Sequence, residues 1–165
     1  MRKIKNWFSL ISIVLSLLTI SGCIEDTLNI NGEKKSYFVK NVIDGDTIEL
    51  SNGKRVRYIG INTPETRKRV GDSWVYDPQP YAVEATIANK GFVEQKNVLL
   101  EFDVQKEDKY NRWLAYVYID DKMVNEELLS QGYGKVLVIP PNTKYYDLFK
   151  SAEREARQFR RGIFK

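Results

Sequence analysis

The sequence contains no histidine among its 165 residues. This absence excludes an imidazole general base, a Ser–His or Cys–His nucleophile pair, and any histidine-ligated metal site. A single cysteine, Cys23, also excludes a disulfide or a thiolate zinc site within one chain. Catalysis would therefore depend on carboxylates, Arg, Lys, Tyr or hydroxyl groups, assisted by an oxygen-preferring ion such as Ca²⁺ or Mg²⁺.

The net charge of the chain is also small. The formal net charge is +4, and Arg2, Lys3 and Lys5 supply three of those charges. The rest of the chain carries too little net charge to coat a polyanion, so any anion binding must be local. The length fits one domain, and 42% hydrophobic with 29% charged residues is typical of a globular protein.

The first residues have the pattern of an export signal. Met1–Lys5 is cationic, and Trp7–Ile20 is apolar except for serines and one threonine. The apolar run is shorter than the ~20 residues that usually span a bilayer, which favours a secretory signal peptide over residues 1–22. Ile20-Ser21-Gly22-Cys23 is similar to the lipobox of prokaryotic lipoproteins, and this implies a mature chain that begins with a lipidated Cys23. An uncleaved signal anchor is the alternative, and both interpretations predict an exported domain held at the outer face of the cell membrane.

The remainder divides into a polar tether at residues 23–35 and a domain at residues 36–165. Turn signals and β-branched or aromatic runs predict five strands, at Tyr37–Ile43, Thr47–Leu50, Lys54–Ile61, Val98–Val104 and Arg112–Ile119. Helical patterns predict Tyr81–Gln95, interrupted by Gly91, then Val124–Gln131 and Tyr145–Arg161. Asn62–Pro80 is predicted to be a long loop. These elements predict a mixed α+β fold, mainly β: a five-stranded OB-fold barrel with about three helices.

The turn Asp44-Gly45-Asp46 places two carboxylates close together. Close carboxylates repel each other unless a cation neutralises them or their side chains point apart. The alternative is that Asp44 accepts a hydrogen bond from its own turn, which is a common role of aspartate in turns. Taken alone, this second interpretation is favoured.

Three other polar positions also have ordinary explanations when each is taken alone. Arg57 alternates with apolar residues on a predicted strand, where an arginine is usually solvated or paired with an acid. Glu65 follows Pro64, whose fixed backbone would hold a carboxylate still, although a surface acid at a helix entry has the same pattern. Arg112 follows a polar turn, where it could be the rim arginine of a hairpin.

The order and spacing of these motifs are more informative than any one of them. The segments Val42–Thr47, Arg57–Thr66 and Asp108–Tyr116 read VIDGDT, RYIGINTPET and DKYNRWLAY. In order and spacing they resemble the staphylococcal nuclease (thermonuclease) family, and Lys122–Glu126 and Leu129–Gly132 continue the match. The resemblance covers roughly residues 37–164, which is nearly the whole exported domain.

This resemblance implies a set of functional residues. The implied catalytic residues are Arg57, Glu65 and Arg112, and the implied Ca²⁺ ligands are Asp46, the residue at the position of Asn62, and the backbone carbonyl of Thr63. Glu65 would orient or deprotonate the attacking water. The two arginines would bind phosphate oxygens with forked, permanently charged donors. A hard metal ion would polarise the phosphoryl group, and none of these roles needs histidine.

The implied metal site departs from the family pattern at Asn62, where the family has an aspartate. An asparagine carbonyl can ligate Ca²⁺, but one negative charge is lost. We therefore expect weaker Ca²⁺ binding, or a preference for Mg²⁺ or another divalent ion. Asp44 is a candidate compensating ligand.

The nucleotide-binding strand departs as well. Val138 and Pro140 stand where family tyrosines stack on the nucleotide, so weaker or differently placed substrate binding is predicted. Tyr110, Trp113 and Tyr133 are candidate substitutes, although burial is favoured for Trp113. The insert at 67–80 carries Trp74 and Tyr76. It is either a lid on the substrate side or, as we favour, a surface loop that packs Trp74 on the barrel.

The sequence therefore predicts a metal-dependent endonuclease, a phosphodiesterase that hydrolyses DNA, RNA or both without sequence readout. It is expected to act as a monomer tethered to the membrane through the lipidated Cys23. The alternative is a non-catalytic OB-fold surface lipoprotein that binds nucleic acid or another polyanion, and a weaker third is a lipoprotein for a small ligand. A pure binder would have no need of Glu65 beside Arg57 and Arg112.

Overall fold

The computed structural model describes residues 34–165. The predicted signal peptide at residues 1–22, the lipidation site Cys23 and nearly all of the tether lie outside the described residues. Strand β1 begins at Lys35, one residue before the predicted start of the domain.

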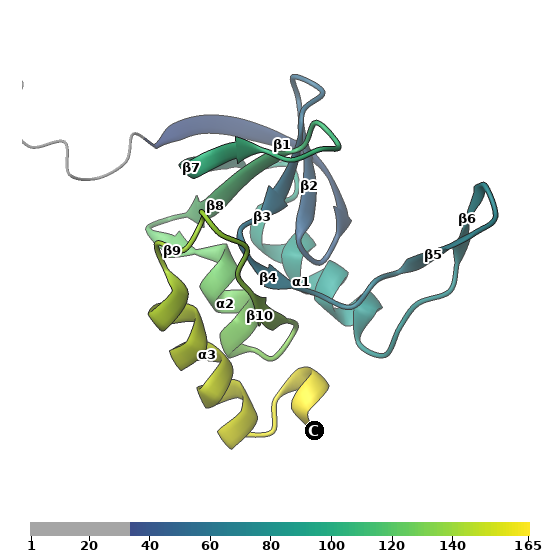
Figure 1. Cartoon of the computed structure of the whole chain (residues 1–165), viewed down its shortest axis with the longest axis vertical. Helices are drawn as coiled ribbons and strands as arrows, with labels where there is room; N and C mark the ends of the chain where they lie inside the picture. The colour runs from purple at the N-terminus through teal and green to yellow at the C-terminus, as the bar shows by residue number, and fades with distance from the viewer. Residues whose placement is uncertain (1–33) are drawn as a thin grey trace, which may run out of the picture. The chain divides into compact units, whose positions relative to one another are not determined.

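Five strands form a closed barrel (Figure 1). They are β1 (Lys35–Asp44), β2 (Thr47–Leu50), β3 (Arg55–Tyr58), β7 (Asn97–Glu107) and β8 (Trp113–Ile119). The sheet order is β3-β2-β1-β7-β8 with antiparallel neighbours, and a parallel pairing of β3 with β8 closes it. The short β9 (Lys122–Met123) continues the sheet beyond β8. The predicted five-stranded barrel is confirmed.

Successive side chains of the strands point alternately into the barrel core and out toward the surface where the candidate active site lies. In β3, Val56 and Tyr58 are buried, whereas Arg55 and Arg57 project from the opposite face. In β1, two register shifts against β2 bend the strand around the barrel. The barrel interior is apolar, with Val39, Ile48, Leu50, Val56, Leu100 and Val117 fully buried.

Three helices pack on the barrel, as predicted: α1 (Ala82–Val93), α2 (Val124–Ser130) and α3 (Tyr146–Gln158), followed by the short η1 (Gly162–Phe164). Two buried asparagines fix α1 and α2. Asn89 of α1 donates to the Asp44 carbonyl at 3.0 Å and accepts from the Tyr58 hydroxyl at 2.9 Å. Asn125 of α2 donates to the Ile59 carbonyl at 2.9 Å. Within residues 34–165, no helix is both long and apolar enough to cross a bilayer.

The predicted interruption of the first helix at Gly91 is wrong, because α1 runs unbroken through it. A glycine inside a helix costs about 1 kcal/mol relative to alanine. Gly91 lies on the exposed face, while Ala82, Ala85 and Val93 are fully buried against the rest of the domain. Tertiary packing therefore outweighs the local preference.

The predicted strand Lys54–Ile61 is divided into β3 and β4 (Gly60–Asn62). Gly60 has φ +81, and a Cβ there would lie 2.3 Å from the Phe149 ring of α3. The glycine therefore permits both the break and the close approach of α3. Strand β4 pairs with β10 (Lys135–Leu137), which was not predicted.

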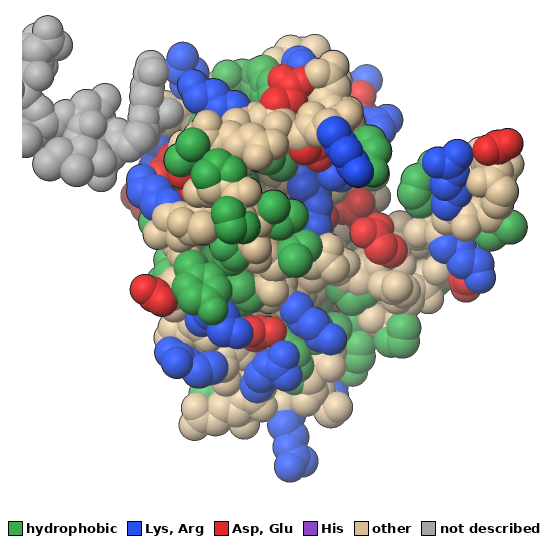
Figure 2. Space-filling view, viewed as in Figure 1, with side chains coloured by type: hydrophobic (Ala, Val, Ile, Leu, Met, Phe, Trp, Pro, Cys, Tyr) green, Lys and Arg blue, Asp and Glu red, His purple; other side chains and the backbone are tan. Residues whose placement is uncertain are grey.

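The predicted loop at 62–80 contains a β-hairpin of β5 (Arg67–Val70) and β6 (Ser73–Tyr76). It stands away from the barrel (Figures 1 and 2). The favoured packing of Trp74 on the barrel is wrong, because Trp74 is 67% exposed.

Candidate active site

The turn between β1 and β2 is packed tightly against the β4 end. The Asp44 Oδ1 accepts a hydrogen bond from the Asp46 backbone N–H at 3.0 Å, so the favoured interpretation of Asp44 as a turn residue is confirmed. A Cβ on Gly45 would lie 2.6 Å from the Thr63 Oγ1 and 2.9 Å from the Ala85 Cβ. Only glycine therefore lets this turn approach Thr63 so closely.

Asp46 is buried, with 3% of its surface exposed. Its Oδ2 accepts hydrogen bonds from the Thr63 N–H at 2.8 Å and the Thr63 hydroxyl at 3.1 Å, and it forms an ion pair with Arg57. Its Oδ1 accepts from the Thr47 hydroxyl at 3.2 Å. Burial, with the nearby charge of Asp44, raises the pKa of Asp46 to about 7, although Arg57 and Thr63 oppose the rise.

The guanidinium of Arg57 is held from two sides. Its Nη2 donates to the Asn62 Oδ1 at 2.9 Å, while Nη1 contacts the Asp46 carboxylate. Nη1 is buried and has no well-aligned hydrogen-bond acceptor in the described part of the chain. Its charge is compensated by the Asp46 carboxylate, with which it forms an ion pair.

Arg112 is oriented by the turn that precedes it. Its Nε donates to the Asp108 Oδ2 at 2.8 Å, and its Nη2 forms an ion pair with the same oxygen at 2.8 Å. Its backbone N–H donates to the Asp108 Oδ1 at 3.1 Å. Partial burial would raise the pKa of Asp108, but the bonds from Arg112 and from the Tyr110 N–H outweigh it and lower that pKa. Asp108 is therefore an ionised clamp on Arg112.

Glu65 is exposed, but its backbone is fixed by the far end of the insert. Its N–H donates to the Gln79 side chain at 2.9 Å, and its carbonyl accepts from the Gln79 N–H at 2.9 Å. Partial loss of water and the charge of Asp44 raise the pKa of Glu65, while Arg57 and Arg112 lower it. The carboxylate therefore lies within electrostatic reach of Asp44 and of both arginines.

Arg57 and Arg112 line the same cavity, whose volume is about 270 Å³. Its wall also includes Gln105 together with the apolar Leu137 and Ile139. Leu137 and Ile139 belong to the segment in which family tyrosines are missing, so that wall is apolar but not aromatic. Two fixed guanidinium groups at one cavity can bind two oxygens of one phosphate.

The proposed metal ligands lie together, and two of their side chains are already engaged by Arg57. Asp46 forms an ion pair with Arg57, Asn62 accepts a hydrogen bond from Arg57, and Thr63 donates to Asp46. No group of three or more Asp, Glu or Cys residues placed to hold a metal occurs within residues 34–165. The donor set is nevertheless entirely oxygen and includes a buried acid, which is the chemistry of Ca²⁺ or Mg²⁺ rather than of a softer metal.

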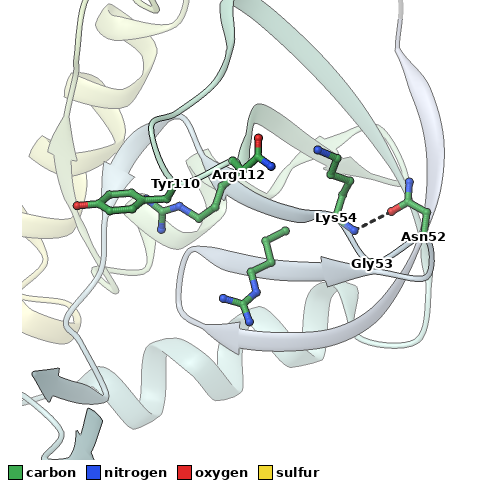
Figure 3. Close-up of a pocket in the computed structure, with 7 residues that line it drawn as sticks. Asn52, Gly53, Lys54, Tyr110 and Arg112 are labelled. Atoms are coloured by element: carbon green, nitrogen blue, oxygen red, sulfur yellow. Dashed lines mark hydrogen bonds between the residues drawn. The ribbon is translucent and has the colours of Figure 1, made fainter. Parts of the chain in front are cut away.

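A second hollow of about 430 Å³ adjoins the first at Arg112 (Figure 3). Tyr110 and Arg112 lie on one side and the turn Asn52–Lys54 on the other. Tyr110 is 68% exposed, and the Arg112 guanidinium lies 5.6 Å from its ring centroid. Arg55 also lines this hollow and has no ion-pair partner among residues 34–165. The hollow is therefore basic, with one accessible aromatic ring.

The other two candidate aromatic substitutes contact the core instead. Trp113 packs edge-on against Tyr37 and Phe102, at 5.4 and 5.5 Å between ring centroids. Tyr133 is half-buried and packs against the core. Of the three candidates, Tyr110 is the exposed one that lines a hollow beside Arg112.

Comparison with known proteins shows which family has this sequence. The sequence profile described as "Staphylococcal nuclease homologue" matches residues 55–165. The chain belongs to the staphylococcal nuclease family. The matched region contains Arg57, Glu65 and Arg112.

Individual members of the staphylococcal nuclease family are similar over most of the chain. The chain is 38% identical to Thermonuclease of Staphylococcus intermedius over 144 residues, which are 86% of this chain and 82% of that protein. It is 36% identical to Thermonuclease of Staphylococcus hyicus over 157 residues, 92% of this chain and 90% of that protein. It is 46% identical to Endonuclease YncB of Bacillus subtilis (strain 168) over 127 residues, which are 74% of this chain and 58% of that protein.

Sequence reasoning missed the residues that support the site. Gln79 fixes the backbone of Glu65, Asp108 orients Arg112, and Lys54 and Arg55 line the second hollow. Asp108 lies inside a quoted motif, and its spacing of four from Arg112 is the only signal that could have revealed such a pair. Gln79 lies in a region without periodicity, so no local signal could have found it.

Proposed function

We propose that this member of a nuclease family hydrolyses phosphodiester bonds of DNA, RNA or both. The observation that carries the proposal is the single cavity lined by Arg57 and Arg112, with the Glu65 carboxylate within electrostatic reach of both. Phosphodiester hydrolysis needs a neutralised phosphate and an activated water. These three side chains supply both functions without histidine.

In the proposed mechanism, the arginines bind the scissile phosphate. Arg57 and Arg112 both line the cavity, and Arg112 is held in place by Asp108. Both guanidiniums stay charged at any working pH. As the water oxygen approaches phosphorus, negative charge grows on the phosphate oxygens, and these preorganised donors stabilise it increasingly.

Glu65 is the proposed general base. It takes a proton from water as the new P–O bond forms. The bond from phosphorus to the leaving sugar oxygen breaks, and that oxygen keeps the electron pair and takes a proton from solvent water. Partial loss of water and the charge of Asp44 raise the pKa of Glu65 above its ordinary value, which makes its carboxylate a stronger base. The paired backbone contacts with Gln79 hold the chain at Glu65 in place for this step.

The family's calcium dependence fits the oxygen donors of this chain. Asp46, Asn62 and the Thr63 carbonyl would hold a Ca²⁺ ion, with Mg²⁺ or another divalent ion as a substitute. The bound ion would supply Lewis-acid polarisation of the phosphate. Because Asn62 contributes no charge, we expect weaker binding than a site with a second aspartate would give.

The second hollow is the proposed path of the substrate beyond the scissile phosphate. Arg55 and Lys54 would contact backbone phosphates, and Tyr110 would stack on a base. Lys54 lies 3.8 Å from the Glu107 carboxylate, so Arg55 is the freer of the two cations.

A cleavage assay distinguishes the enzyme from a non-catalytic polyanion binder. The full-length protein is incubated with single-stranded DNA or RNA in Ca²⁺, Mg²⁺, Mn²⁺ or a chelator. Shortened products in at least one metal, and none with the chelator, are expected. Intact substrate in every metal, with binding retained, would favour the non-catalytic binder.

We further propose that residues 1–22 are a signal peptide and that Cys23 carries a lipid which anchors a monomeric domain to the outer face of the membrane. The cationic start, the short apolar run and the lipobox-like Ile20–Cys23 support this. Cys23→Ser should move the protein from the membrane fraction to the medium or release a soluble form. Unchanged membrane association would favour an uncleaved anchor.

A further inference from the structure

The hairpin β5–β6 leaves the domain directly beside the candidate base. At the end of the hairpin nearest the barrel, hydrogen bonds between Glu65 and Gln79 hold the two chain segments together. The Asp77 N–H also donates to the Thr66 carbonyl there, at 3.2 Å. Strand β5 begins at Arg67, two residues after Glu65. In Figure 1 the hairpin projects away from the barrel, so both of its faces are open to solvent.

Strand register sorts the hairpin side chains onto two faces. Arg67 lies opposite Tyr76, and Arg69 lies opposite Trp74. Residues directly opposite, and residues two apart on one strand, share a face. One face therefore carries two arginines and two aromatic rings, and we call it the arginine–aromatic face. The opposite face carries Lys68, Val70, Ser73 and Val75.

The arginine–aromatic face has no core beneath it. Trp74 and Tyr76 are 67% and 65% exposed, so neither ring stabilises the domain by burial. Arg67 has no ion-pair partner among residues 34–165. Arg69 contacts Asp72 at 3.4 Å, but such an exposed pair contributes at most about 1 kcal/mol and exchanges readily for another anion. The Nε of Arg69 also donates to the Gly71 carbonyl at 3.1 Å, within the turn of the hairpin. Exposed aromatic rings beside exposed cations mark an interaction surface.

We propose that the arginine–aromatic face binds the single-stranded continuation of the nucleic-acid substrate. This proposal rests on the proposed function and adds a third contact region to it. Arg67 and Arg69 match backbone phosphates in charge, and they lie roughly 6.7 Å apart along the strand. Trp74 and Tyr76 match unpaired bases, since every base presents a face that can stack on an aromatic ring.

The position of the hairpin favours a nucleic acid over a lipid surface. Glu65 lies within electrostatic reach of the two arginines at the cavity, and the hairpin begins two residues after Glu65. Figure 2 shows Lys and Arg side chains on the hairpin next to apolar ones, with only the acids at its turn and base to repel phosphate. An anionic membrane would also attract this composition, so vesicles form the second arm of the test.

The test measures binding with a chelator present, so that its outcome does not depend on catalysis. A fluorescently labelled single-stranded DNA of about 16 nucleotides is titrated with the full-length protein and with Trp74→Ala/Tyr76→Ala. Loss of two stacked rings should raise the dissociation constant about tenfold or more. The matched control is Val70→Ala/Val75→Ala on the opposite face, which should change it less than about twofold. Equal melting temperatures of all proteins check the fold.

Three outcomes would overturn the proposal. The first is an unchanged dissociation constant in the aromatic variant, and the second is an equal loss in the control variant. The third is a loss of binding to phosphatidylserine vesicles with DNA binding intact, which would assign the face to the membrane. If the unmutated protein cleaves no substrate in any metal but shows the expected loss of DNA binding, the proposed function fails while the arginine–aromatic face stands.

Discussion

Replacing Arg112 with lysine separates the charge of this residue from its shape. In the structure, Nε donates to Asp108 and Nη2 forms an ion pair with it, which leaves Nη1 to meet a phosphate oxygen in the shared cavity. Lysine keeps the charge but has a single nitrogen, so it cannot hold Asp108 and present a second donor in a fixed direction. We therefore expect Arg112→Lys to lose much of its turnover although the positive charge is kept.

The magnitude follows from the loss of one preorganised donor. Such a loss costs about 2.7–4 kcal/mol of transition-state stabilisation, or roughly 10²–10³ in kcat. The side chain is 28% exposed, so the missing ion pair should cost only about 1 kcal/mol of stability and the protein should stay folded. The assay is the turnover of single-stranded DNA at saturating substrate, with circular dichroism to check folding. Asp108→Asn, which retains Arg112, is the control and should lose less activity. A kcat for Arg112→Lys within about threefold of the unmutated value would refute the reasoning.

Three further predictions test other parts of the site and the fold. The pKa of Glu65 is raised above its ordinary value of 4.5, and a carboxylate acts as a base only when it is ionised. The kcat should therefore fall with decreasing pH through a midpoint above 4.5, and a midpoint at or below 4.5 would contradict the role of Glu65 as the base. Asn62→Asp should lower the Ca²⁺ concentration for half-maximal activity about tenfold, whereas half-saturation of the unmutated protein in the low micromolar range would count against a weakened site. Glu101 is buried, and burial acts to raise its pKa, but hydrogen bonds from Lys144 and Tyr118 outweigh this and lower the pKa. The ionised Glu101 therefore stabilises the fold fully above its ordinary pKa, and this stabilisation is lost as the pH falls through the lowered pKa. Glu101→Gln should therefore reduce the free energy of unfolding by roughly 1.5–3 kcal/mol near neutral pH and by less in acid, and an equal effect at both pH values in urea denaturation would exclude this cause.

The barrel was predictable because its strands carry the signal locally. Alternation in Arg55–Tyr58 marks one buried face, and Asn52-Gly53 marks the turn before it. Strand β10 and the division at Gly60 were missed because both depend on distant partners. Strand β10 pairs with β4 across the sequence, and Gly60 is required by the Phe149 ring. Neither constraint leaves a local pattern.

The candidate site was predictable in a different way. The spacing of Arg57, Glu65 and Arg112 alone does not bring them together, and it was the family resemblance that implied a shared site. The structure places both arginines at one cavity and the glutamate within electrostatic reach. The hairpin β5–β6 was predicted as a loop. All eight of its strand residues are exposed, so neither strand has a buried face that would require apolar residues at every second position.

The most direct test of the central claim is the cleavage rate of Glu65→Gln. This change removes the proposed base while keeping nearly the same size and shape, and Glu84→Gln, at an exposed position on α1, is the matched control. We expect Glu65→Gln to lower kcat for single-stranded DNA at least about 10²-fold and to leave binding in a chelator nearly unchanged, while Glu84→Gln cleaves normally. Cleavage by Glu65→Gln at the unmutated rate would contradict it.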